Sequence, residues 1–141
     1  MQSVILDTNI VVSALIQRSY PHYIVYEYAM NGQMELCLSE ELMKEYCDVL
    51  SRPKFARIPD FVSNAAIVLK RFENIGTFYK PKIKLEILKD VSDNKLLELA
   101  DESKADFLVT GNSLDFTIQH YKNTQILSPR SFWEINFENI V

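Results

Sequence analysis

Short apolar runs alternate with longer segments of helical periodicity along the chain, and this alternation constrains the fold more than any other feature. Most contain β-branched residues, and all are short enough to be buried strands. They cover residues 3–6, 35–38, 77–79, 107–109 and 125–127. Strands separated by helices predict an α/β fold, with a central parallel sheet of about five strands and helices on both faces.

The signals that begin and end helices agree with this order. Ser39 is a good N-cap for a helix that ends before Pro53, and Glu40 and Glu41 in its first turn favour the helix dipole. The predicted helices cover residues 10–17, 21–31, 40–50, 59–74, 93–103 and 114–121, with a short final helix from Pro129. The chain contains no internal repeat or linker, so one domain is predicted over residues 1–141.

The N-terminus and the cysteines indicate where the protein is expected to act. The chain runs straight into apolar residues 4–6 without a basic segment, so no signal peptide is expected. No stretch approaches the ~18 apolar residues of a membrane span, so a cytoplasmic location is expected. Cys37 and Cys47 lack a CxxC spacing, and we expect buried small side chains rather than a zinc site.

Three acidic residues are placed where they can reach the carboxyl ends of the strands, at which open parallel sheets bind ligands. Asp7 directly follows the first strand. Glu45 lies at the edge of the apolar face of its helix, and Asp93 lies on the apolar face of a later helix, shortly after Asp90. Each has a simpler explanation: Asp7 and Asp93 as helix caps, with Ser92 competing for the second, and Glu45 as a solvent-exposed side chain.

A divalent cation would reconcile these acidic side chains with one shared site. Carboxylates brought together without a positive charge between them are costly. Mg²⁺ prefers oxygen ligands, holds one or two carboxylates directly and keeps waters that a substrate phosphate can replace. Such an ion can activate a water for attack on phosphorus and stabilise charge on the departing oxygen.

The order of these residues resembles that of PIN domains over almost the whole chain. The opening motif VILDTN lies at residues 4–9, and the second acidic block consists of SEELMKE and VLSRPKF at residues 39–45 and 49–55. The third block DVSDNKLLELA, the fourth block ADFLVTGN and the final strand ILSP lie at residues 90–100, 105–112 and 126–129. Each motif is weak singly, and their joint order carries the resemblance.

The resemblance implies a Mg²⁺- or Mn²⁺-dependent endoribonuclease in which Asp7, Glu45 and Asp93 bind metal and take part in catalysis. Within the family, the chain is similar to the VapC toxins of toxin–antitoxin pairs, which are typically homodimers neutralised by a partner antitoxin. One position departs from the pattern. The fourth block often ends in an aspartate, where this chain has Asn112. Asp115 is the candidate to supply the missing carboxylate, with a helix cap or a solvated side chain as the alternative.

RNA contacts are expected from residues near these carboxylates. Arg52 and Lys54 follow the Glu45 helix directly. Further candidates for substrate binding are Thr8, Asn9 and Thr110 at strand ends, Arg57, Lys80, Lys82 and Lys84 for phosphates, and Tyr20, Tyr23 and Phe55 for base stacking. A solvated lysine-rich loop and core aromatics are the alternative for most of them. The net charge of -4 argues against strong nucleic-acid binding unless the acidity is concentrated in a metal site.

Two other functions stay open at the level of sequence. A haloacid-dehalogenase-like phosphatase also begins with a strand-end aspartate, but its motif has a second aspartate where this chain has Asn9. A catalytically weak or silent PIN-like binding module, acting through a protein partner, would result if Asn112 has abolished activity.

Overall fold

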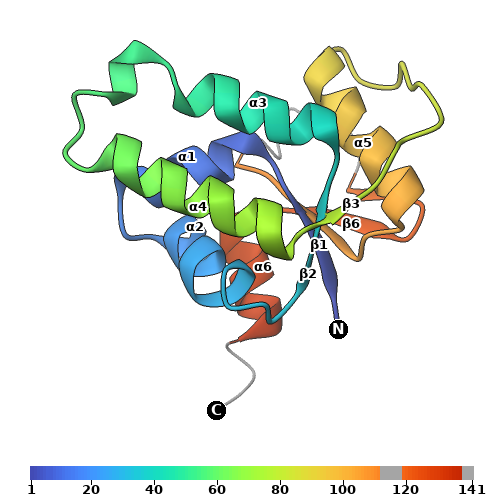
Figure 1. Ribbon diagram of the computed structural model, residues 1–141. Coiled ribbons are helices and arrows are strands. Elements are labelled where there is room, and N and C mark those ends of the chain that lie inside the picture. Colours follow the sequence, from blue (N-terminus) through green and yellow to red (C-terminus); the bar gives the residue numbers. More distant parts are fainter. Residues whose placement is uncertain (112–118, 138–141) are drawn as a thin grey trace.

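A six-stranded sheet forms the frame of the molecule, which a computed structural model describes for residues 1–111 and 119–137 (Figure 1). The strand order is β3-β2-β1-β4-β6-β5. The strands are β1 (Ser3–Leu6), β2 (Glu35–Leu38), β3 (Thr77–Phe78), β4 (Phe107–Val109), β5 (His120–Tyr121) and β6 (Thr124–Leu127). Neighbouring strands are parallel except β5 and β6, which are antiparallel. The predicted α/β class is confirmed.

The short strand β5 differs from the prediction of about five parallel strands. The sequence pattern predicts a helix up to residue 121, whereas Tyr121 pairs with Thr124 in a tight hairpin. Lys122 adopts a φ of 50° in the turn, a conformation that two-residue hairpin turns require. The end of the predicted helix is therefore wrong, because this local reversal of the chain outweighs helical periodicity. Residues 112–118 lie outside the described residues.

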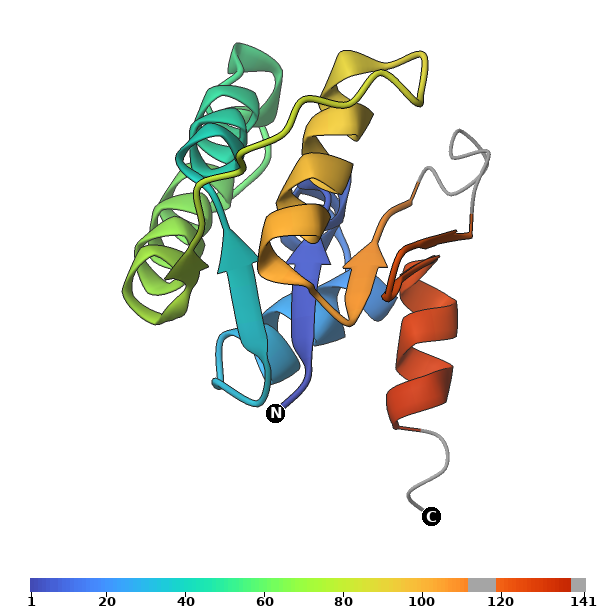
Figure 2. The same ribbon diagram turned by 90° about the vertical axis from the view of Figure 1, so that its right-hand side faces the viewer.

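Helices cover both faces of the sheet, as predicted. They are α1 (Thr8–Ile16), α2 (Tyr20–Tyr23), α3 (Glu40–Leu50), α4 (Phe61–Ile75), α5 (Val91–Ser103) and α6 (Pro129–Asn136), with a π-helical segment (Ile24–Ala29) after α2 and a 3-10 turn (Pro53–Phe55) after α3. Figure 2 shows α5 in front of the sheet and α1 and α2 behind it, with α3 and α4 beside β2. The carboxyl ends of the parallel strands thus face a space bordered by α3 and α5.

Strand β1 lies at the centre of the sheet and is buried along its whole length. Its Val4, Ile5 and Leu6 side chains have no exposed surface. A strand between two parallel neighbours, with helices on both faces, has no solvent side, which explains its continuous apolar run. Leu6 pairs with Val109 of β4, so the residues after these two strands emerge next to one another.

The start of α3 confirms the cap expected from the sequence. The Ser39 hydroxyl accepts a hydrogen bond from the Leu42 N–H at 3.1 Å at the start of α3. Ser128 does the same for the N–H of Ser131 at the start of α6. The helix predicted over residues 21–31 is instead α2 followed by the wider π-helical turns, with the Met30 N–H bonded to the Val25 carbonyl.

The segment over residues 79–90, of which the sequence leaves 80–89 unassigned, has no regular structure but is bound to α5. It passes over the carboxyl ends of the strands from β3 to α5 (Figure 2). The buried side chain of Asn94 bonds both the N–H and the carbonyl of Leu88, each at 2.8 Å. The Glu98 carboxylate accepts from the Leu85 N–H at 2.9 Å. These bonds replace the strand or helix partners that the backbone lacks.

The two cysteines differ in their exposure to solvent. Cys37 is buried, as predicted, but Cys47 is exposed because it lies on the outer side of α3. Within the described residues, no helix is both long enough and apolar enough to cross a membrane.

Candidate active site

Four carboxylates from three separate parts of the chain line one hollow at the carboxyl end of the sheet. They belong to Asp7, Glu45, Asp90 and Asp93, and we call this space the acidic hollow. Its volume is about 460 Å³, and it is open to solvent. Glu45 comes from α3, whereas Asp90 and Asp93 come from the start of α5. The three acidic residues singled out in the sequence therefore lie together rather than on separate surfaces.

Asp7 is the most deeply buried of these carboxylates, with 8% of its surface exposed. It occupies the N-cap position of α1, but its side chain makes no capping hydrogen bond. Instead, the Thr110 hydroxyl donates to its Oδ2 at 2.7 Å. Burial raises the pKa of Asp7, and the charges of Glu45 and Asp90 add to this, while hydrogen bonds from Thr110 and the Thr8 backbone oppose it. The helix-cap explanation of Asp7 is therefore not the one the structure supports.

Glu45 is half-buried on α3. Its Oε2 accepts a hydrogen bond from the Thr8 hydroxyl in the first turn of α1. The next residue, Tyr46, is fully buried and donates to the Leu6 carbonyl at 2.5 Å. Burial, and then the charges of Asp7 and Glu45, hold the pKa of Tyr46 well above its usual value, so this hydroxyl stays protonated.

At the start of α5 the cap is Asp90, which corrects the expected choice between Asp93 and Ser92. The Asp90 Oδ1 accepts from the Ser92 N–H at 2.8 Å. Asp93 lies in the first helical turn, half-buried, with its side chain in the lining of the acidic hollow. Its position is therefore not that of a helix cap.

The donor set fits a hydrated Mg²⁺ or Mn²⁺ ion. Carboxylate oxygens are the ligands that these cations prefer, and Mg²⁺ usually keeps several waters while binding one or two carboxylates. Among the residues that the structure describes, no three acidic, histidine or cysteine side chains are close enough to hold an ion between them. The hollow thus suits an ion held partly through water, with the buried Asp7 charge as the strongest reason for a cation there.

Two basic side chains, Arg52 and Lys54, line the same hollow, as the sequence order predicts. The neighbouring Phe55 is buried and stacks on Phe61 at a centroid distance of 4.8 Å. The Lys54 ammonium lies 5.1 Å from the Phe55 ring centre. Phe55 thus packs in the core and also lines the hollow, and its role in base stacking stays a prediction.

Comparison with known proteins then decides the family, because the family model described as PIN domain matches residues 3–114. The chain belongs to the PIN domain family. PIN domains are generally nucleases, so membership indicates a hydrolase of nucleic acids. A curated relative, Uncharacterized protein MJ1680 of Methanocaldococcus jannaschii, is 25% identical over 109 residues, which cover 77% of this chain and 70% of the relative. No solved structure matches the chain.

Three polar residues of this PIN domain that are expected to bind substrate make hydrogen bonds within the site. The Thr8 and Thr110 hydroxyls donate to Glu45 and Asp7, as described above. The Asn9 side-chain oxygen accepts from the Gly111 N–H at 3.1 Å, which joins the start of α1 to the end of β4. Because sequence position alone places these residues at strand ends, it does not separate substrate contact from support of a carboxylate.

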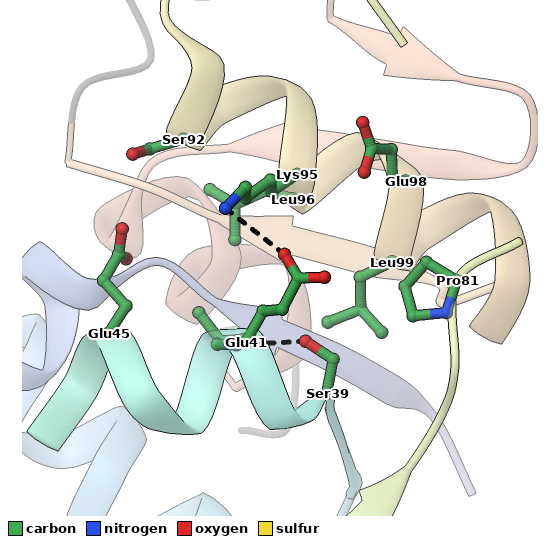
Figure 3. A pocket seen from close by; sticks show the side chains of 10 residues that line it. Ser39, Glu41, Glu45, Pro81, Ser92, Lys95, Leu96, Glu98 and Leu99 are labelled. Atoms are coloured by element: carbon green, nitrogen blue, oxygen red, sulfur yellow. Dashed lines mark hydrogen bonds and ion pairs between the residues drawn. The ribbon is translucent and has the colours of Figure 1, made fainter. Parts of the chain in front are cut away.

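A second hollow lies beside the acidic hollow, between α3 and α5, and the two share Glu45 (Figure 3). Leu42, Leu96 and Leu99 contribute apolar surface to it. The Lys95 ammonium lies 3.3 Å from the Glu41 carboxylate and links the two helices. Both of these side chains are well exposed, so this ion pair adds little stability.

The remaining predicted site residues are not placed in the acidic hollow. Asn112 and Asp115 lie outside the described residues. The ring of Tyr23 packs beside Trp133 at 5.7 Å, and that of Tyr20 does not line the hollow. The sequence analysis missed Tyr46 and Asn94. The available signal was a tyrosine next to the helical glutamate and an asparagine next to Asp93, but both occur at core-facing positions where packing is the simpler explanation.

We expect the substitution Asp7→Asn to stabilise the protein when a chelator removes divalent ions. A raised pKa means that the folded state binds the Asp7 proton more tightly than the unfolded chain does. The associated stability is present below the ordinary value of 3.8 and is lost as pH rises through the folded-state pKa. Asparagine keeps an oxygen for the Thr110 hydroxyl and carries no charge. Thermal unfolding in chelator should show a higher midpoint for the variant at neutral pH, and a smaller difference in acid.

The matched control for this experiment is Glu73→Gln, an exposed position on α4. It should change the midpoint little at either pH. A lower unfolding midpoint for Asp7→Asn at neutral pH would contradict the electrostatic account of the hollow.

Proposed function

We propose that this PIN domain is a divalent-metal-dependent endoribonuclease that hydrolyses RNA phosphodiester bonds with Mg²⁺ or Mn²⁺. The observation that carries the proposal is the convergence of Asp7, Glu45 and Asp93 in the acidic hollow, from elements far apart in the sequence. A site for nucleic-acid hydrolysis needs both charge stabilisation and a positioned water, and a carboxylate-bound cation supplies both.

Each side chain of the site has a role in this proposal. Asp7, Glu45 and Asp93 would hold the ion, which when bound provides an activated water and neutralises charge on the departing oxygen. The Thr110 and Thr8 hydroxyls orient two of these carboxylates. Arg52 and Lys54, on the rim of the hollow, would bind phosphates on either side of the scissile bond.

Replacing Asp7 or Asp93 by asparagine is expected to lower the rate of metal-dependent RNA cleavage at least about 100-fold. Mutation of residues that only hydrogen-bond to metal ligands already lowers metal affinity or activity by about 10–100-fold. The fold should be retained, since each variant keeps the size of the side chain. Cleavage of a single-stranded RNA would be measured with Mg²⁺, with Mn²⁺ and with chelator. Undiminished cleavage by both variants would show that Asp7 and Asp93 do not form the catalytic site. Glu73→Gln is again the surface control.

Arg52→Ala and Lys54→Ala are each expected to weaken RNA binding and to lower the slope of log affinity against log salt by about 1. Each lost phosphate contact releases one counterion fewer. Lys70→Ala, at an exposed position on α4 away from the hollow, should leave the slope unchanged. Binding would be titrated with the Asp7→Asn protein as background so that RNA is not cleaved. Equal slopes for all variants would exclude these two side chains from the interface.

The biological role we propose is that of the toxin in a toxin–antitoxin pair, acting as a homodimer and neutralised by an antitoxin protein. The support is the similarity of the motif order to VapC toxins. Expression of the wild-type chain should arrest growth of the host cell, whereas Asp7→Asn should not. Co-expression of a DNA-binding protein encoded by a short neighbouring gene should restore growth. Growth unaffected by an active enzyme would contradict the toxin role.

Family membership favours a nuclease over the haloacid-dehalogenase-like phosphatase. The weak or silent binding module stays a second candidate because Asn112 replaces the aspartate common at that position. Calorimetric titration of the wild-type protein with Mg²⁺ separates the two, since only the enzyme requires the ion.

A further inference from the structure

The peptide bond between Leu6 and Asp7 is held from both sides where β1 leaves the sheet. Its N–H, on Asp7, donates to the Val109 carbonyl of β4 at 3.0 Å. Its carbonyl, on Leu6, accepts from the Tyr46 hydroxyl of α3 at 2.5 Å. Since the N–H and C=O of a planar trans peptide point in opposite directions, the two bonds fix both its position and its rotation. The backbone that carries Asp7 is thereby tied to the helix that carries Glu45.

The Leu6 carbonyl lies beyond the part of β1 that pairs with β2. That pairing joins Ser3 to Glu35 and Val4 to Leu36, whereas the last two residues of β2 pair with β3 on its other side. A buried carbonyl without a donor is destabilising, so the end of the strand needs a partner from elsewhere. The Tyr46 hydroxyl supplies it from the first turns of α3.

Packing alone does not require a hydroxyl at this position. The Tyr46 ring is fully buried and lies 6.1 Å from the ring centre of Phe72. Phenylalanine would fill the same space, and a buried hydroxyl is unfavourable unless it is hydrogen-bonded. What the hydroxyl adds is a directional contact, which sets the distance between α3 and the peptide before Asp7.

A second bond joins the same two pieces of chain. The Thr8 hydroxyl donates to the carboxylate of Glu45, the residue before Tyr46. Residues 6–8 and residues 45–46 are therefore linked at two points, one through a backbone carbonyl and one through a carboxylate. Two links prevent the pivoting that a single link allows, so the Asp7 and Glu45 carboxylates keep one spacing.

We propose that Tyr46 is a positioning residue for the metal site: its hydroxyl fixes the spacing of the Asp7 and Glu45 carboxylates and so sets the affinity for Mg²⁺ or Mn²⁺. The inference rests on the proposed function, because it requires that these carboxylates share an ion. Tyr46 does not line the acidic hollow and would act through the Leu6 carbonyl.

The test compares Tyr46→Phe with Tyr79→Phe by calorimetric titration of the full chain with Mn²⁺. Tyr79 is the matched control because its hydroxyl also makes a 2.5 Å bond, to Glu35, and does not line the acidic hollow. We expect Tyr46→Phe to weaken Mn²⁺ binding about 10-fold. Loss of a residue that positions metal ligands typically lowers metal affinity by about 10–100-fold. Tyr79→Phe should bind as the wild type does. A variant with 4-aminophenylalanine at position 46 restores an N–H donor and should recover most of the affinity.

The outcomes separate the two proposals. Mn²⁺ binding by the wild type, with equal affinity in Tyr46→Phe, overturns the role of Tyr46 and leaves the proposed function standing. No Mn²⁺ binding by the wild type overturns both. If Tyr46→Phe does not fold, the 4-aminophenylalanine variant decides, since a folded variant with that donor and without wild-type affinity contradicts the inference.

Discussion

The burial of the Asp7 carboxylate at the end of the sheet, beside other carboxylates, is the constraint on which the rest of the site depends. Burial raises the pKa of Asp7, and the nearby charge of Glu45 raises it further. Two neutral donors, the hydroxyls of Thr110 and Thr8, form hydrogen bonds to these two carboxylates. Such donors orient a carboxylate without cancelling its charge. The Asp7 and Glu45 carboxylates are therefore held in place by hydroxyl groups of the protein itself.

Parallel strand pairing brings together residues that the sequence keeps apart. The register of Leu6 with Val109 places Asp7 beside Thr110, a hydrogen-bonded pair separated by 103 positions. Helix α3 approaches the same point from β2 and is tied there through Tyr46. The site is thus assembled by the central strand and its two neighbours, and little of it depends on the outer strands, where the sheet differs from the prediction.

The sequence was sufficient to predict the α/β class, the strand positions at the centre of the sheet and the acidic residues that share the hollow. Local periodicity and caps determine those features. It was insufficient for β5, because the two-residue turn that begins at Lys122 contains no glycine to mark it in the sequence. It also could not distinguish Thr8 as a contact for substrate from Thr8 as a donor to Glu45, since both need a hydroxyl at one place.

The segment between β3 and α5 is attached by hydrogen bonds between its main chain and the side chains of Asn94 and Glu98, and by the burial of Leu88. Its outward side chains, including Lys84 and Ile87, take no part in that attachment. The path of this backbone therefore does not depend on which side chains it exposes to solvent. During evolution, the rim beside the carboxylates can exchange charged for apolar groups, and so change which molecules it admits, while the path of the backbone stays the same.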